Sequence, residues 1–164
     1  MKRRGSALII CLLLISALLI LALTFLSQHA SESQATRRWT LAHQARELAR
    51  AGLEDARAKL AVDIRFPPPS PANSTVYVYS EDFYANDGTT LLGTFEVEID
   101  SALQAPPYEV LRLRSRGWIG PRQEPTAIYE LRAEIDIAQE NRNGNGAVNP
   151  GLWQWTQFSD LGGI

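Results

Sequence analysis

The pattern of hydrophobic and polar positions divides the chain into three parts. Between Ser6 and Leu26, 18 of 21 residues are apolar, which predicts a helix that is apolar all round. Further on, apolar or small residues recur at steps of three and four, as on one face of an amphipathic helix. These positions are Leu41, Ala45, Leu48, Ala49, Gly52, Leu53, Ala56 and Leu60. After residue 75 apolar and polar residues alternate, which is typical of half-buried strands.

The apolar run, 6–26, is long enough to cross a bilayer, because as a helix it would extend roughly 31 Å. Lys2, Arg3 and Arg4 precede it, and no basic residue follows before Arg37. We therefore expect a cytoplasmic N-terminus and an extracytoplasmic remainder. A cleaved secretory signal is the competing interpretation, but its apolar core is usually about 7–15 residues long and is followed by an A-x-A-like site, which this chain lacks. We expect a single membrane pass that stays in the mature protein.

The amphipathic helix is expected to continue the membrane segment over 27–65. No Gly or Pro occurs between Leu26 and Gly52, which favours an unbroken helix. Prolines from Pro67 onward end the helix near residues 62–65, and 66–74 forms a proline-rich linker. The alternative is a membrane anchor followed by a helix of an unrelated domain.

Four segments with period-two alternation predict a sheet over 75–138. They are Thr75–Tyr79, Thr94–Asp100, Glu109–Arg116 and Ala127–Ile137. Their short connections favour antiparallel neighbours, and the apolar face of each strand can lie on the amphipathic helix. The fold class is therefore α+β, with a long N-terminal helix packed on a small antiparallel sheet.

The outward positions of the predicted strands carry opposite charges on neighbouring strands. Arg112, Arg114 and Arg116 alternate along one strand, and acidic residues alternate along the strands before and after it. In a meander these charges would face each other and favour the pairing. We interpret the three arginines as a structural ladder in preference to a phosphate or ligand site, because acidic neighbours would occupy them.

The last segment, 139–164, is predicted to form an Asn/Gly loop followed by a Trp-rich stretch. Asparagines at alternate positions from Asn141 have the spacing of a calcium loop, but they supply no charge, and Leu152 stands where the closing Glu would be. A polar loop without metal is our interpretation. Trp153, Trp155 and Phe158 either pack back over the sheet or helix or form an exposed surface for a partner.

The distribution of charge and the absence of catalytic motifs exclude several classes of function. The formal net charge is -2, but 27–65 holds seven basic and five acidic residues, whereas 66–164 holds six and thirteen. Such an acidic head is not expected to bind nucleic acid directly. Cys11 is the single cysteine, so an intramolecular disulfide is excluded, and His29 and His43 lie about 21 Å apart along a helix, too far to share a metal. Without phosphate-loop or nucleophile motifs, we expect no cofactor and no enzymatic activity.

The N-terminal part of the chain resembles the type IV pilin class. The resemblance rests on the leader and junction KRRGSALI (2–9), on the membrane-length run that follows, and on LARAGLE (48–54) in the continuing helix. It covers residues 1–60 and is most similar to minor pilins of the PilX type and, at the N-terminus, to the K-type minor pseudopilin of type II secretion. It implies a pilin-like fold, removal of residues 1–5 by a prepilin peptidase that cuts between Gly5 and Ser6, N-methylation of Ser6, and a helix that joins a filament core.

Two positions depart from the family pattern. The first mature residue is Ser6 in place of the common Phe or Met, and the fifth is Ile10 in place of Glu. In the family that Glu pairs with the N-terminal ammonium of a neighbouring subunit, and an isolated charge in lipid is costly. Because Ile10 cannot form this pair, the subunit should be poor at building a continuous shaft.

The resemblance therefore implies a low-abundance subunit that primes or caps a type IV pilus or a type II secretion pseudopilus. Its partners would be other minor pilins or pseudopilins, the major subunit and the prepilin peptidase. It would reside in the bacterial inner membrane before assembly, with its head in the periplasm, and then at a filament tip. The competing interpretation is a signal-anchored envelope or binding protein that never enters a filament.

Overall fold

The computed structural model describes residues 4–63, 66–68, 74–142 and 146–163, and for residues 4–8 the backbone alone. The chain divides into two compact units, 1–40 and 41–164. The helix α1 (Arg4–Val62) belongs to both. It ends within the range that the sequence predicts, since the amide of Asp63 donates the last helical hydrogen bond to the carbonyl oxygen of Lys59 at 2.9 Å, just before the prolines begin.

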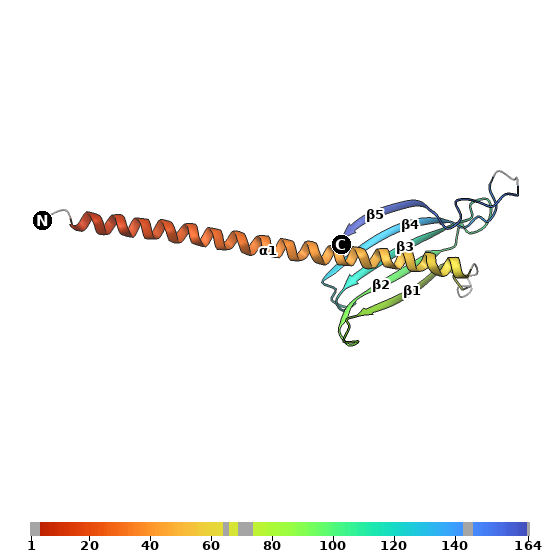
Figure 1. Cartoon of the computed structure of the whole chain (residues 1–164), viewed down its shortest axis with the longest axis horizontal. Coiled ribbons are helices and arrows are strands. Elements are labelled where there is room, and N and C mark those ends of the chain that lie inside the picture. Colours follow the sequence, from red (N-terminus) through yellow and green to blue (C-terminus); the bar gives the residue numbers. More distant parts are fainter. Residues whose placement is uncertain (1–3, 64–65, 69–73, 143–145, 164) are drawn as a thin grey trace. The chain divides into compact units, whose positions relative to one another are not determined.

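Five strands form one sheet in the second unit. They are β1 (Val76–Tyr84), β2 (Leu91–Asp100), β3 (Val110–Ile119), β4 (Ala127–Asp136) and β5 (Trp155–Gly163). Their order in the sheet is their order in the sequence, and all neighbours are antiparallel, as Figure 1 shows. The predicted α+β class and the antiparallel meander are both confirmed.

The fifth strand, β5, was not predicted from the sequence. It pairs with β4 along its length, but the register shifts between Glu130 and Leu131 and again between Glu134 and Ile135. Each shift breaks the period-two alternation by which a strand is recognised. The segment also ends in Gly162 and a second glycine, which weaken a strand signal.

The part of α1 from residue 41 onward covers one face of this sheet. The helix buries Ala45, Ala49, Leu53, Ala56 and Leu60, all of them on the predicted apolar face. The sheet buries Phe95, Val97, Ile99, Leu111, Leu113, Leu131, Ala133 and Ile135 against them. Each fully buried Leu, Ile or Phe contributes about 1.5–3 kcal/mol, so this helix–sheet layer holds the head together.

Two glycines allow the helix to lie very close to the sheet. A Cβ atom at Gly52 would stand 2.5 Å from Ser115 Oγ and 2.9 Å from Val97 Cγ2. On the opposite side of the contact, a Cβ atom at Gly117 would press on the carbonyl oxygen of Ala45 and stand 2.6 Å from the amide nitrogen of Ala49. A side chain at either glycine would therefore force helix and sheet apart.

Polar contacts hold the helix at both edges of the sheet. At β1, Tyr79 Oη donates a hydrogen bond to Asp55 Oδ2 at 2.8 Å, and Lys59 Nζ lies 2.5 Å from the same oxygen. Burial and this hydrogen bond raise the pKa of Tyr79. At β5, Arg46 Nε donates to Asp160 Oδ2 at 3.1 Å. These contacts fix the direction in which α1 crosses the strands.

The outer face of the sheet carries the predicted charge ladder, with one exception. Each arginine of β3 lies opposite an acidic residue of β2: Arg112 opposite Asp100, Arg114 opposite Glu98, and Arg116 opposite Glu96. On the β4 side Arg112 and Arg116 also lie opposite acidic residues, but Arg114 lies opposite Arg132. These two arginines both donate hydrogen bonds to the carboxylate of Glu130, which offsets their repulsion.

Candidate functional site

The first part of α1 presents an apolar surface with no cover. Every large hydrophobic side chain from Ile9 to Leu26 is 55–71% exposed, and Ile10 is 55% exposed. This stretch lies near the N-terminus and is long and apolar enough to cross a membrane. By length and composition it suits a membrane anchor or a signal sequence. Its exposure means that its stability depends on lipid or on other apolar helices.

The predicted processing residues lie at the edge of what the structure describes. Gly5 and Ser6 are part of the α1 backbone, without described side chains, as is Arg4. Lys2 and Arg3 lie outside the described residues. Leader removal, the role of the leader charges and the role of Ile10 therefore remain predictions.

A buried carboxylate organises the outer face of the sheet. Glu130, on β4, is only 2% exposed and accepts hydrogen bonds from Arg114 Nη2 at 2.7 Å, Arg116 Nε at 3.0 Å and Arg132 Nη2 at 3.0 Å. Burial alone would raise the pKa of Glu130, but the hydrogen bonds from these arginines lower it to about 2. These arginines are thus held by acids, in agreement with a structural ladder.

The three aromatic residues predicted as a partner surface are not gathered in one place. Trp153 and Trp155 are half-buried and pack against the core, and Phe158 is 50% exposed. Trp155 and Phe158 line one groove, whereas Trp153 lines a different pocket. Trp153 and Trp155 therefore pack back over the sheet and helix, which is one of the two alternatives considered from the sequence. Phe158 is the most exposed of the three aromatic residues.

The groove with Trp155 and Phe158 lies between α1 and β5. It measures about 300 Å³, and Arg46 and Arg50 contribute to its helical side. The guanidinium of Arg57 lies 5.8 Å from the centre of the Trp155 ring, a distance compatible with a cation–π contact. The groove combines an exposed aromatic ring with charges of both signs, because Glu54 also lines it and Arg46 already pairs with Asp160.

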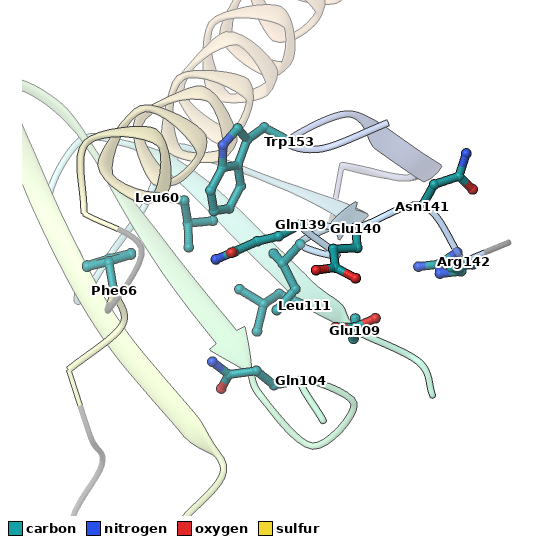
Figure 2. Close-up of a pocket in the computed structure, with 11 residues that line it drawn as sticks. Leu60, Phe66, Gln104, Glu109, Leu111, Gln139, Glu140, Asn141, Arg142 and Trp153 are labelled. Carbon is teal, nitrogen blue, oxygen red and sulfur yellow. The ribbon is translucent and has the colours of Figure 1, made fainter. Parts of the chain in front are cut away.

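The second hollow is a pocket of about 510 Å³ beside the C-terminal end of α1, shown in Figure 2. Leu60 of the helix and Leu111 of β3 supply buried apolar side chains. Phe66, Trp153 and Ile137 add further apolar surface, while polar groups come from the loop before β3 and the loop after β4, namely Gln104, Glu109, Gln139, Glu140, Asn141 and Arg142. The pocket is formed entirely by the second unit of the chain.

Two residues that line this pocket have a strained backbone. Glu109 has a φ of 49° and Trp153 a φ of 63°, in the left-handed region that residues with a side chain seldom adopt. Each such residue costs about 1–3 kcal/mol and persists only where neighbouring contacts enforce it. Here the carbonyl oxygen of Glu109 accepts from the Ile137 amide at 3.0 Å, and the Trp153 amide donates to the carbonyl oxygen of Asp136 at 2.9 Å.

Asp136 holds the rim of the pocket in place. Its carboxylate is 9% exposed, and Oδ1 accepts hydrogen bonds from the Ala138 amide at 3.0 Å and from Arg142 Nη2 at 3.1 Å. A second bond from Arg142 Nη2 reaches the carbonyl oxygen of Tyr108 at 3.0 Å. The Asp136 carboxylate therefore orders the loop after β4, and Arg142 links that loop to the loop before β3.

Sequence reasoning did not find this pocket. Its polar residues come from loops that are more than 30 positions apart, such as Gln104 and Gln139, and none belongs to a motif. The Asn/Gly loop next to it was noticed, but residues 143–145 lie outside the described residues. No protein-family model, curated protein or solved structure matches this chain.

Proposed function

We propose that this chain is a minor pilin or pseudopilin, a structural subunit that primes or caps a type IV pilus or a type II secretion pseudopilus. The observation that carries the proposal is its pilin-like architecture. One helix has an apolar N-terminal part whose described large side chains are exposed, and its later part buries one face against a five-stranded antiparallel sheet. Such a helix can be held in a bilayer after synthesis and packed among other apolar helices afterwards.

Ile10 favours a subunit that sits at the tip of the filament and disfavours one that is repeated along the shaft. A shaft subunit of the family neutralises the N-terminal ammonium of its neighbour with a carboxylate at this position, because an unpaired charge among apolar helices is costly. This chain offers an isoleucine side chain there. A first or last subunit has one neighbour fewer and therefore does not need to satisfy that charge on both sides.

Charge supports lateral docking to partner subunits. The segment 27–65 has two more basic than acidic residues, whereas 66–164 has seven more acidic than basic. Opposite signs on neighbouring subunits would steer the stalk of one toward the head of another. Co-purification with partner minor pilins should then weaken as salt rises, and retention that does not change with salt would contradict this docking.

The proposal is tested most directly at the N-terminus of the mature protein. In cells with an active prepilin peptidase, intact-mass measurement should show a chain that begins at Ser6, whereas in cells lacking the peptidase residues 1–5 should remain. Gly5→Leu should block the cut, because a bulky residue before the cleaved bond does not fit the family pattern. Ser16→Leu, a change of similar size within the apolar run, should leave the cut unaffected.

A chain that keeps Met1 in cells with active peptidase would overturn the proposal. That result would favour the single-pass envelope or binding protein, whose anchor stays intact. A processed chain that appears as the main component of purified filaments would instead refute only the tip assignment.

A further inference from the structure

The pocket beside the C-terminal end of α1 contains polar side chains that the protein itself does not use. Within the described residues, the side chains of Gln104, Glu109, Gln139 and Glu140 have no hydrogen-bond or ion-pair partner. Arg142 is different, because Tyr108 and Asp136 already engage its guanidinium. Four groups able to accept hydrogen bonds therefore border one hollow, and two of them can also donate.

The same pocket offers an apolar surface on which a flat ligand could lie. Figure 2 shows the Trp153 ring next to Leu60, with Leu111 below them and with Gln139 and Glu140 close to Leu111. Trp153 and Phe66 are only half-buried although both pack against the core. A half-buried tryptophan ring adjacent to hydrogen-bonding groups is a suitable contact for a molecule that is apolar on one face and polar at its edge.

The strained residues lie where they shape this hollow. The left-handed backbone at Glu109 and at Trp153 places a carboxylate and the indole ring on the same pocket. The end of β4 holds both segments, because the carbonyl oxygen of Asp136 accepts from the Trp153 amide and the amide of the next residue, Ile137, donates to the carbonyl oxygen of Glu109. These backbone hydrogen bonds hold the groups in place, so a ligand would meet them already in position.

The polar groups define the class of ligand. Carboxylates accept hydrogen bonds from hydroxyl and amide groups, and carboxamides both accept and donate, so together they match a ring that carries several hydroxyls. Because Asp136 neutralises Arg142, Glu109 and Glu140 leave the pocket with an excess of negative charge. An acidic ligand would therefore be repelled. The volume of about 510 Å³ lies within the range of small-molecule sites.

We propose that this pocket binds a neutral or amino sugar residue, with the ring lying against Trp153 and the hydroxyls contacting Glu109, Glu140 and the two glutamines. The sugar can come from a glycan strand or from free saccharide, since both present the same ring. This binding does not depend on assembly into a filament, so it can fail or succeed independently of the function proposed above.

The test uses the full chain in zwitterionic micelles that contain no sugar headgroups. Glucose, N-acetylglucosamine, glucuronate and acetyl-arginine amide are compared as ligands by saturation-transfer NMR and by titration calorimetry. A chitin oligosaccharide as a further probe separates a glycan strand from free saccharide. We expect glucose or N-acetylglucosamine to bind at millimolar concentration, and glucuronate to bind about tenfold more weakly because of charge repulsion.

Two matched variants locate the site. Glu140→Gln removes a charge from the pocket and should weaken sugar binding about tenfold, because the ligand loses a charge-assisted hydrogen bond. Glu124→Gln removes an exposed carboxylate from the connection between β3 and β4, outside the pocket, and should leave binding unchanged. Neither side chain has a partner among the described residues, so both variants should keep the fold, which circular dichroism checks.

Three outcomes would overturn the proposal. The first is the absence of binding by every sugar at millimolar concentration. The second is an equal effect of Glu140→Gln and Glu124→Gln. The third is binding of acetyl-arginine amide in preference to the sugars, which would identify the pocket as a site for a basic side chain of a partner protein.

Discussion

Replacing Glu130 by Gln removes the carboxylate that Arg114, Arg116 and Arg132 share. All three donate to it within 3.1 Å, and its own side chain is 2% exposed. The variant keeps the shape of the side chain but leaves three guanidinium groups next to one another without their common counter-charge. We therefore expect Glu130→Gln to destabilise the head more than any change to an exposed ion pair on the same face.

The expected magnitude follows from the pKa of Glu130. Its pKa falls from the ordinary 4.5 to about 2, and each pKa unit corresponds to about 1.4 kcal/mol, so the ionised carboxylate contributes on the order of 3 kcal/mol to folding. Breaking a buried ion pair by removing one partner costs about 3–5 kcal/mol, which agrees. Because the pKa is depressed in the folded state, this contribution is fully present above pH 4.5 and is lost as the pH falls toward 2.

The assay is urea unfolding of the full chain in micelles, followed by tryptophan fluorescence at several pH values. Glu134→Gln is the matched control, because Glu134 is 30% exposed and, among the residues that the structure describes, pairs with Arg112 alone, at 3.0 Å. Such an exposed pair should cost about 1 kcal/mol or less. The gap between wild type and Glu130→Gln should be largest near pH 7 and should close on acidification. A gap no larger than that of the control, or one that persists unchanged to pH 2.5, would refute the reasoning.

Three further results are expected. Gly52→Ala brings a Cβ atom within 2.5 Å of Ser115 Oγ and should lower the unfolding free energy by about 1–3 kcal/mol. This loss should be smaller in a protein that already carries Ser115→Ala, which lacks the hydroxyl. Urea unfolding measures the effect of Gly52→Ala with and without Ser115→Ala, and equal losses would exclude the contact. Gly117→Ala should cost more than Gly52→Ala in the same assay, because its Cβ atom meets the backbone of the helix, which cannot rotate away; a smaller cost would mean that the helix shifts freely. Ile10→Glu should increase the share of this subunit in purified filaments, as quantified by mass spectrometry, and an unchanged share would show that Ile10 does not limit incorporation.

Much of the fold could be predicted because each element repeats a simple period. The helical face from Leu41 to Leu60 and the alternation in four strands are strong signals, and the structure contains these elements in the predicted order. The strand β5 escaped prediction because its two register shifts interrupt the alternation. The buried state of Glu130 was also missed, since its position in the pattern is that of a solvent-facing residue, and burial results from three arginines closing over it.

The candidate sites were predictable to a smaller degree. The apolar run and the junction at Gly5 are local features, so the sequence alone shows them. The pocket at the end of α1 depends on how Arg142 joins the loop after β4 to the loop before β3, and no short segment of the sequence contains both partners of that contact. The sequence shows that Trp153, Trp155 and Phe158 lie close together along the chain, but Trp153 lies in the turn before β5 and Phe158 within β5, so they line different hollows.

The close approach at Gly117 also determines how the strands are aligned. Charge alone does not select one alignment of β3, because sliding this strand by two positions would still place Glu96 opposite an arginine, Arg114. The same slide would bring Ser115 beneath the helix in place of the glycine, and any side chain there collides with the helix backbone. Sliding by a single position would turn the arginines toward the core. The missing side chain of Gly117 thus selects one alignment of β3 over the alignments that are shifted by one or two positions.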